Sequence, residues 1–470
     1  MSGSGDQNAG RRDGRVPSKL SPAVSESLSS FSDSILAEHL EEISFLHGQR
    51  ETMLLEPALS WRDLQPFEER LEKHLAAIAW CGDRAATACA AKIAEGDAGE
   101  VYGALRVLCR LAKVEALVSS IAGRCAKGGE PASAAAQALG AETKGEWQKL
   151  TLLGLAGTGE ALWPVAARVV GWQRLPMRKF LLDAFERQNP APEICWAAGR
   201  LGLVEAAPGI HKHAATEDAV LRDAAVRALL TLGDRRMVDE LGARVTESWT
   251  HLPLALCCGP AAAHALVDAV KRGTPEPQSL LALGALGVPE AVEILIAQLE
   301  EETLNATAAA ALAMITGAPL VKERFEPEEV RREELFPDEI AKLDKGESLT
   351  PPGEKPRGRV VTEIDVDPAS WKSWWANNSS RFRQGQRYLN GQPTTPTAVV
   401  AALNASFPAA SRELMLAELT IRHHCEVFAD IRMTVLEQEA ELAKMSEWAK
   451  REAARFRPGG WYYHGEALAT

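Results

Sequence analysis

Two histidines and two glutamates on neighbouring predicted helices are the first residues whose types could support chemistry. His39 and Glu42 lie three residues apart and share one helix face, and Glu69 and His74 lie on the next predicted helix. Carboxylates and imidazoles on facing helices are the ligands of metal sites in helical bundles. Here the order is His-x-x-Glu rather than Glu-x-x-His, and the step from Glu69 to His74 turns those two side chains apart. We therefore expect hydrogen bonds and ion pairs within a hairpin, and no bound metal.

The other histidines offer no better arrangement. His423, His424 and Cys425 are adjacent, so on a helix their side chains point about 100° apart and do not converge. His211 and His213 meet the same objection and are expected in a loop. The chain contains no HExxH, no Walker loop, no nucleophile elbow and no GxGxxG after a strand. The sequence predicts no catalytic residue and no cofactor.

A segment from Arg381 to Pro393 concentrates positive charge and aromatic rings in an otherwise acidic chain. Its basic and aromatic members are Arg381, Phe382, Arg383, Arg387 and Tyr388. Arginine beside aromatic rings is typical of interface hot spots and of single-strand nucleic-acid contacts. The favoured interpretation is internal packing, with the arginines paired to the acidic stretch 326–334; docking of a partner protein competes with it. If the chain has a docking surface here, we expect these five residues to form it.

The overall charge narrows the class of partner. With 64 acidic and 52 basic residues the net charge is -12 and the pI is near 5.5, which argues against nucleic acid and anionic membranes. The expected partner is another protein, whose surface could be basic. The first 30 residues lack the apolar run of a secretory signal, and no run of about 18 apolar residues predicts a membrane span. Eight cysteines without a CxxC motif are interpreted as small buried hydrophobes in a reducing cytoplasm.

The elements that must position any site are predicted by a repeat of roughly thirty residues. Glycines recur in similar contexts at positions 202, 233, 259, 287 and 317, with steps of 31, 26, 28 and 30 residues. Such a period is typical of stacked helix pairs that bury a core against their neighbours. Between about 140 and 200 the repeat degrades, which we interpret as a divergent or inserted unit.

Composition divides the chain into five parts. We expect a disordered tail at 1–30, a capping helical hairpin at 31–82 and a solenoid of HEAT-like repeats at 83–320. A charged linker with proline and glycine follows at 321–370, and a helical block at 371–470. The predicted fold class is therefore all-α, an α-solenoid with an N-terminal hairpin and a C-terminal helical block.

Three segments resemble a bacterial family of HEAT-like repeat proteins that has no established activity. They are the helix His39–Leu46 followed by Glu68–Leu75, the repeat end Ala310–Gly317, and the box Arg387–Pro393. The likeness frames the chain from about 35 to 425. It implies a solenoid fold, and because some members accompany type VI secretion genes, it implies an accessory role in a secretion or effector system.

These observations together predict a noncatalytic, protein-binding scaffold or adaptor in the cytoplasm. The alternative from another class is an enzyme or enzyme subunit on a similar scaffold, of the bilin-lyase or DNA-base-excision type. A base-excision enzyme needs a basic concave face, which the net charge of -12 disfavours. The sequence leaves the partner's identity, the number of repeats and the oligomeric state open.

Overall fold

A computed structural model describes residues 22–57, 59–142, 146–187, 191–327, 335–345, 349, 358–405 and 407–469. This part of the chain is mostly helical, and its strands form only three two-stranded antiparallel pairs. The all-α part of the predicted fold class is therefore confirmed, apart from these short strands. Within the same residues, no helix combines the length and the apolar character that crossing a bilayer requires.

Two long helices open the described chain. Helix α1 (Pro22–Leu55) begins inside the range 1–30 that was predicted to be a disordered tail, so residues 22–30 are helical. Residues 1–21 lie outside the described part. A short 3₁₀ turn, capped by the Ser60 side chain, leads into α2 (Gln65–Ala79), which packs against α1 and α4. Leu40, Ile43 and Leu75 lie in this contact and are fully buried, as expected for the hairpin.

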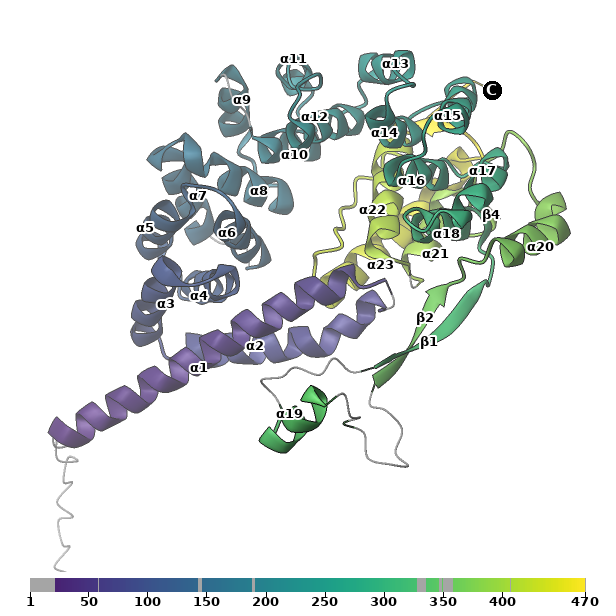
Figure 1. Ribbon diagram of the computed structural model, residues 1–470. Coiled ribbons are helices and arrows are strands. Elements are labelled where there is room, and N and C mark those ends of the chain that lie inside the picture. Colours follow the sequence, from purple (N-terminus) through teal and green to yellow (C-terminus); the bar gives the residue numbers. More distant parts are fainter. Residues whose placement is uncertain are drawn as a thin grey trace, which may run out of the picture.

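Helices α3 to α18 form a curved row of pairs, which Figure 1 shows as an arc. Each even-numbered helix packs on the next even-numbered one, so these helices form one layer of the row. That layer contains α4 (Ala98–Arg110), α6 (Glu130–Ala141), α8 (Trp163–Gln173), α10 (Pro192–Arg200), α12 (Ala219–Thr231), α14 (His251–Ala255), α16 (Pro277–Leu286) and α18 (Asn305–Thr316). The odd-numbered helices are α3 (Asp83–Glu95), α5 (Val114–Cys125), α7 (Glu146–Thr158), α9 (Arg178–Glu186), α11 (Ala207–His211), α13 (Arg235–Ala243), α15 (Pro260–Arg272) and α17 (Val292–Ala297).

Residues with left-handed backbone end most helices of the even-numbered layer and account for the glycine period. Gly202, Gly233, Gly287 and Gly317 follow α10, α12, α16 and α18 with φ of 69°, 78°, 72° and 59°, a conformation that glycine adopts at least cost. Gly259 differs, because it precedes α15 with φ of −90°. After α4 and α8 the left-handed position is held by Ala112 and Arg174. The row therefore continues through the range near 140–200, where the glycine signal is lost.

The range 321–370, predicted to be a linker, contains regular structure. Strand β1 (Val321–Pro327) pairs antiparallel with β2 (Gly358–Ile364) in a mostly exposed ribbon. Helix α19 (Pro337–Asp344) lies between the two strands in sequence, and α20 (Pro368–Asn378) begins directly after them. Figure 1 shows the ribbon extending away from the arc. The hydrogen-bonded register of the two strands holds the ends of this long insertion together.

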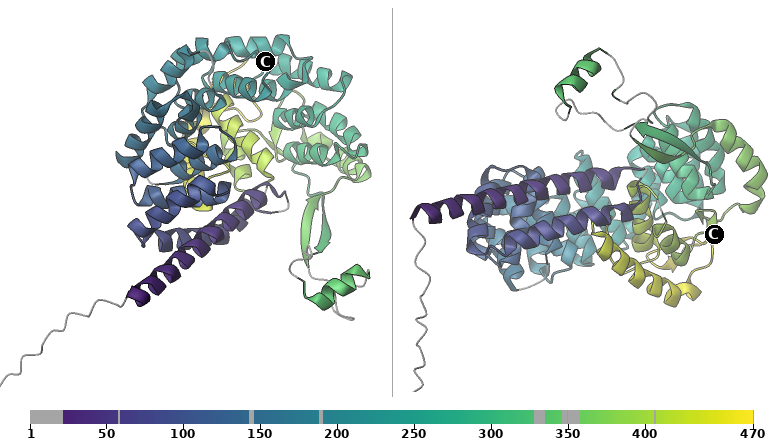
Figure 2. Two further views of the ribbon diagram at one scale, coloured as in Figure 1. Left: turned by 60° about the vertical axis from the view of Figure 1, so that its left-hand side comes forward. Right: turned by 90° about the horizontal axis from the view of Figure 1, so that it is seen from below.

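Apart from its first helix, α20, which lies on the outer side of the arc beside α17, the C-terminal block lies inside the arc, against its later half (Figures 1 and 2). It begins with α20 and a hairpin of β3 (Tyr388–Leu389) and β4 (Gln392–Pro393). Helices α21 (Pro396–Leu403), α22 (Ala409–Ala417) and α23 (Val435–Glu452) follow, with a π-helical turn, Glu418–Arg422, after α22. A second hairpin of β5 (Tyr462–Tyr463) and β6 (Glu466–Ala467) comes last.

The block is held on the C-terminal ends of the even-numbered helices. Arg422, which is fully buried, donates to the carbonyls of Ala255 and Cys258 at the end of α14 at 2.7 and 2.9 Å. The Tyr388 amide donates to the Gly287 carbonyl after α16 at 2.6 Å. Carbonyls at a helix C-terminus have no partner within the helix and carry partial negative charge, so donors and cations are stabilising there. These contacts fix the block inside the arc and thereby shape the site below.

Candidate functional site

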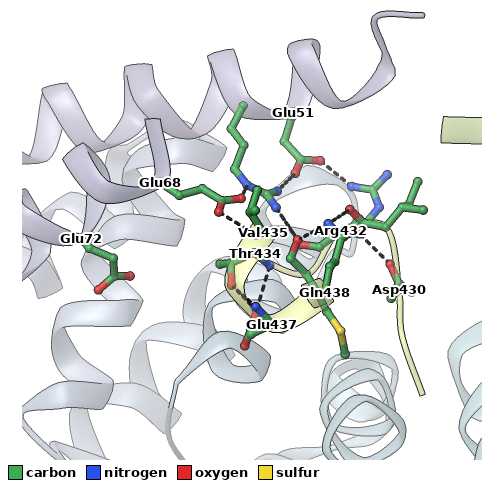
Figure 3. Close-up of polar contacts among 12 residues, drawn as sticks. Glu51, Glu68, Glu72, Asp430, Arg432, Thr434, Val435, Glu437 and Gln438 are labelled. Carbon is green, nitrogen blue, oxygen red and sulfur yellow. Dashed lines mark hydrogen bonds and ion pairs between the residues drawn. The ribbon is translucent and has the colours of Figure 1, made fainter. Parts of the chain in front are cut away.

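The N-terminal helices meet the C-terminal block where the C-terminal end of α1 and the start of α2 reach the segment before α23 (Figure 3). Arg50 Nε donates to Glu68 Oε1 at 2.8 Å, and Arg50 Nη2 donates to the carbonyls of Arg432 and Met433 at 3.1 and 2.9 Å. The other oxygen of Glu68 accepts the Val435 amide at 2.8 Å. The arc is thus closed by a polar cluster, which we call the junction: Arg50, Glu51, Glu68, Arg432 and Val435.

Local sequence explains why α23 begins at the junction. Thr434 and Glu437 form a reciprocal capping box, in which each side chain accepts the other residue's amide. The carboxylate of Glu68 meets a further free amide of the first turn and lies at the positive end of the helix dipole. Arg432 adds an ion pair with Glu51 on α1. Each charged group of the junction therefore has a partner contributed by a distant part of the chain.

A cavity of about 470 Å³ opens beside the junction. Three parts of the chain line it: the N-terminal helices α1 and α2, helices α4 to α10 of the row, and the segment 432–437. Alanines and glycines of α6 and of the turn before it make one wall small and apolar, including Ala132 and Ala136. A cavity of this volume is in the usual size range of ligand sites. It forms only when the row and the C-terminal block are closed on each other.

Charged groups on the α4 side of the cavity are paired. The buried Arg106 donates to Glu142 Oε1 at 2.6 Å, to Glu72 Oε1 at 2.8 Å and to the Tyr102 hydroxyl at 3.0 Å. Arg110 bonds the same two carboxylates. Burial acts to raise the pKa of Glu72, but the two arginines outweigh it and lower that pKa. The Glu72 carboxylate therefore stays ionised near neutral pH, and its bonds to the two arginines make this wall a fixed one.

His47 is a neutral, hydrogen-bonding group in the same wall. It is only 8% exposed, and its ring stacks on Tyr102 with a centroid distance of 3.9 Å. Burial lowers the pKa of His47 to about 4, because the charged imidazolium would lose its hydration. Its Nδ1 has no hydrogen-bond partner among the described residues. An unpaired buried nitrogen is costly, so this atom can accept or donate a bond to a bound group.

Arg168 on α8 is the guanidinium of the cavity that is not held by a carboxylate. It lies over the Trp196 ring, 4.2 Å from the guanidinium carbon to the ring centroid. Burial lowers its pKa from the usual arginine value. Within the described part of the chain it forms no ion pair within 4.0 Å, although Asp430 and Glu193 lie in its field. The cavity therefore combines a small apolar wall with one uncommitted cation and one uncommitted imidazole.

The predicted partner-binding residues divide into buried and exposed ones. Phe382, Arg387 and Tyr388 are buried, whereas Arg381 and Arg383 are exposed. The ring of Phe382 contacts that of Tyr388 at 4.8 Å between centroids. Three of the five residues thus hold the C-terminal block on the row, and only the two exposed arginines are available to a partner.

The partner predicted for Arg387 is wrong. It does not pair with the stretch 326–334, most of which lies outside the described residues. Instead Arg387 forms a bidentate pair with Glu418 at 2.6 and 2.8 Å and donates to the carbonyls of Leu286 and Ala285 at 2.9 and 3.0 Å. Burial acts to raise the pKa of Glu418, but Arg387 outweighs it and holds that pKa at about 2. The fork of the guanidinium fits both a carboxylate and a helix end, which no sequence pattern indicated.

The histidines are explained by packing. His39 and His74 meet at 2.8 Å between their Nδ1 atoms, and Arg70 pairs with Glu42, as the structural interpretation of the hairpin predicts. His211 pairs with Asp234 at 3.0 Å. The described residues contain no group of three or more His, Cys, Asp or Glu side chains placed to hold a metal.

Two further histidines lie in the C-terminal block. His423 is buried, and burial lowers its pKa to about 4. His424 is exposed, and its ring contacts that of His464 in a tilted arrangement, with 3.8 Å between the centroids.

The cysteines are mostly as predicted. All eight are free, and seven are buried; Cys81 is exposed and is the exception to the predicted burial. Burial raises the pKa of the Cys89 and Cys195 thiols to about 12 and of the Cys125 thiol to about 11. Such thiols are protonated near neutral pH and are poor nucleophiles.

The junction and the cavity residues Arg50, Glu68 and Arg168 were not found from the sequence. A glutamate or arginine on a helix face is ordinary, and the contacts that give Arg50 and Glu68 their role join segments more than 360 positions apart. No family model, no curated protein and no solved structure matches this chain. The functional argument therefore rests on the geometry alone.

Proposed function

We propose that this chain is a noncatalytic scaffold or adaptor on an α-solenoid of HEAT-like type, and that the junction cavity is where it binds a partner protein. One observation carries the proposal: three distant parts of the chain contribute side chains to one cavity of about 470 Å³. Because the cavity is lined by both the arc of helices and the segment that closes it at the junction, binding there depends on the closed shape of the arc. That property suits a protein that organises another protein.

The chemistry of the walls supports binding over catalysis. Carboxylates of the cavity such as Glu68 and Glu72 are bonded to arginines or to a backbone amide, and do not face each other as an acid and a base would. Arg168, His47 and Glu193, which also lines the cavity, can donate or accept hydrogen bonds to a bound group. The apolar wall around Ala132 and Ala136 supplies area for a side chain of the partner.

A substitution at the cavity's edge tests this proposal. Ser133 is exposed and lines the cavity, so Ser133→Trp should obstruct it without disturbing the core. Ser119→Trp, at an exposed position of α5 outside the cavity, is the matched control. Affinity purification from the native cell with quantitative mass spectrometry should show a partner that the wild type and Ser119→Trp recover and Ser133→Trp loses. Equal recovery by both variants would remove the cavity from partner binding.

A further inference from the structure

A segment of the C-terminal block occurs twice. Residues 381–393 and 455–467 both follow the pattern Arg-Phe-Arg-x-Gly-x-x-Tyr-x-x-Gly, with each residue of the first copy 74 positions before its counterpart. A tryptophan precedes both at the same offset, Trp374 and Trp448. We call the two segments the first copy and the second copy.

The two copies have the same local structure. The Arg383 amide donates to the Tyr388 hydroxyl at 2.7 Å, and the Arg457 amide donates to the Tyr462 hydroxyl at 2.5 Å. The Phe and Tyr rings lie 4.8 and 4.9 Å apart between centroids in the first and second copy. A 3₁₀ turn precedes each copy's turn and hairpin at matching positions, η8 (Ser379–Arg381) and η10 (Ala453–Arg455). The repeated sequence is thus a repeated structural unit.

Both copies also dock in the same way. Two successive amides of each hairpin tip donate to two successive carbonyls at the end of a helix. The pairs are Asn390 with Met314 and Gly391 with Ile315 in the first copy, at 2.5 and 3.0 Å, and His464 with Ile421 and Gly465 with Arg422 in the second, at 2.8 and 2.9 Å. The unit therefore attaches to the unpaired carbonyls of a helix end.

This internal role accounts for nearly all of the repeated residues. The shared Phe and Tyr are packed together, and the shared glycines have positive φ: 76° and 72° at Gly385 and Gly391, 71° and 80° at Gly459 and Gly465. The first arginine is explained as well. Arg381 donates to Asn378 at 3.3 Å, and Arg455 donates to Glu452 at 3.0 Å, three residues earlier in each copy and at a helix end.

The second arginine of each copy is not explained by packing. Arg383 and Arg457 are both exposed, and in the described structure neither side chain forms a hydrogen bond or an ion pair. Their turns need a glycine two residues later but place no demand on the side chain of the arginine. Each copy therefore carries an exposed cation at the same position without a structural task.

The two turns that carry the exposed arginines lie against each other. The indole of Trp461 donates to the Gly385 carbonyl at 2.9 Å, and the Arg387 amide donates to the Gly459 carbonyl at 3.1 Å, so the two turns touch. Each exposed arginine is two residues from the glycine of its turn, a separation of at most about 7 Å along the chain. One extended segment of a bound molecule can reach both.

We infer that Arg383 and Arg457 form a paired basic surface that binds an acidic segment of a partner protein. Exposed guanidiniums recognise carboxylates by charge-assisted hydrogen bonds. A nucleic acid fits less well, because the aromatic rings of both copies are buried and offer no stacking surface, and the chain carries a net charge of -12. This surface is separate from the junction cavity, so the inference goes beyond the proposed function.

The test measures binding of a fluorescein-labelled polyglutamate peptide to the full chain by fluorescence anisotropy. Arg383→Glu/Arg457→Glu should weaken binding about tenfold or more, since two attractive contacts become repulsive. Arg236→Glu/Arg272→Glu, which reverses two exposed arginines of α13 and α15, changes the net charge equally and should leave binding nearly unchanged. Added salt should weaken the wild type and have little effect on the double variant.

Three results would overturn the inference: equal binding by the two double variants, no salt dependence, or tighter binding of a single-stranded oligonucleotide than of the peptide through the same arginines. The melting temperature of Arg383→Glu/Arg457→Glu should match that of the wild type because both side chains are exposed. If it falls, Arg383→Gln/Arg457→Gln repeats the measurement with less perturbation. Loss of peptide binding in that variant at unchanged melting supports the surface, and unchanged binding rejects it.

Discussion

The carboxylate of Glu68 accepts the backbone amide of Val435 at 2.8 Å, although the two residues are 367 positions apart. This bond places an acidic side chain of the second helix at the start of the last long helix. The same carboxylate holds Arg50. A single buried glutamate thus ties the first part of the chain to the last, and the cavity beside it exists because of that closure.

Glu68→Gln should lower the free energy of unfolding more than the same substitution at an exposed position of the same helix. The substitution removes the closer of the two carboxylates that pair with the buried Arg50 and leaves only Glu51, at 3.4 Å, so a loss of up to about 3 kcal/mol in the free energy of unfolding is expected. Glu69→Gln, at the adjacent exposed position, is the control and should change it by less than about 0.5 kcal/mol. Chemical denaturation followed by circular dichroism measures both, and equal effects would contradict the importance of the junction.

Substitutions of Arg387 and Arg383 should differ strongly in their effect on stability, although both residues belong to the segment Arg381–Pro393. Arg387→Ala removes the bidentate partner of the buried Glu418, which keeps only Arg422 at 3.4 Å, and leaves two helix-end carbonyls without this donor, so the free energy of unfolding should fall by about 3 kcal/mol or more. Arg383→Ala removes an exposed side chain and should cost less than about 0.5 kcal/mol. Thermal melting of the two single variants distinguishes them; comparable losses would mean that the box acts as one packed unit.

Mild acid should weaken the fold through its buried histidines. His47 has a folded-state pKa of about 4, below its ordinary value of 6.5, so the unfolded state binds the proton first. Stability is therefore complete above pH 6.5 and falls as the pH drops toward 4, by at most about 3 kcal/mol for this residue. His423 has the same direction and window. Glu418, with its pKa held at about 2, loses its contribution only below about pH 4.5.

His47→Phe isolates one part of this pH profile, because the new ring can keep the stacking on Tyr102. The variant should lose less stability between pH 6.5 and 4 than the wild type does. His264→Phe, at an exposed position, should leave the slope unchanged. Denaturant titrations at several pH values provide the measurement, and parallel curves for His47→Phe and the wild type would refute the assignment.

Gly287 should tolerate no side chain. Its φ is +72°, and a Cβ there would lie 2.4 Å from the Tyr388 carbonyl oxygen, which belongs to the docked hairpin. Gly287→Ala is expected to cost about 2 kcal/mol or more, through backbone strain and displacement of the hairpin. Gly242→Ala, inside α13 with open space around it, should be neutral or slightly stabilising. The melting temperature should therefore fall for Gly287→Ala and stay the same or rise slightly for Gly242→Ala.

The helical class and the row were predictable because they follow from local periodicity. Glycines at 202, 233, 287 and 317 end helices as left-handed caps, which is the property that produced the thirty-residue period. The period was lost near 140–200 because Arg174 holds the same backbone conformation without being glycine. The left-handed position at the helix end is thus kept after α8, although the glycine that indicates it elsewhere is absent.

The site could not be predicted in the same way. Arg50 and Glu68 acquire their role from contacts with residues 432–435, and nothing in their local sequence distinguishes them from surface charges. The segment at Arg381 stands out by its composition, but composition does not indicate which of its residues are buried and which are exposed. Arg387 binds carbonyls at a helix end, and a pattern of charged residues does not reveal such acceptors. The repeat of this segment at 455–467 is visible in the sequence as six identical residues at one spacing, so sequence alone could have indicated that the segment is a structural unit.

The most direct test of the account is site-specific photocrosslinking in the native cell. A benzophenone amino acid at Gln137, which lines the cavity, should give one discrete covalent adduct with a partner protein on irradiation. The same probe at Leu153, an exposed position on α7 outside the cavity, should not give that adduct. Glu68→Gln, which loosens the junction, should reduce the yield at Gln137. An adduct that forms equally at both positions, or only at Leu153, would contradict the cavity as the binding site of this scaffold.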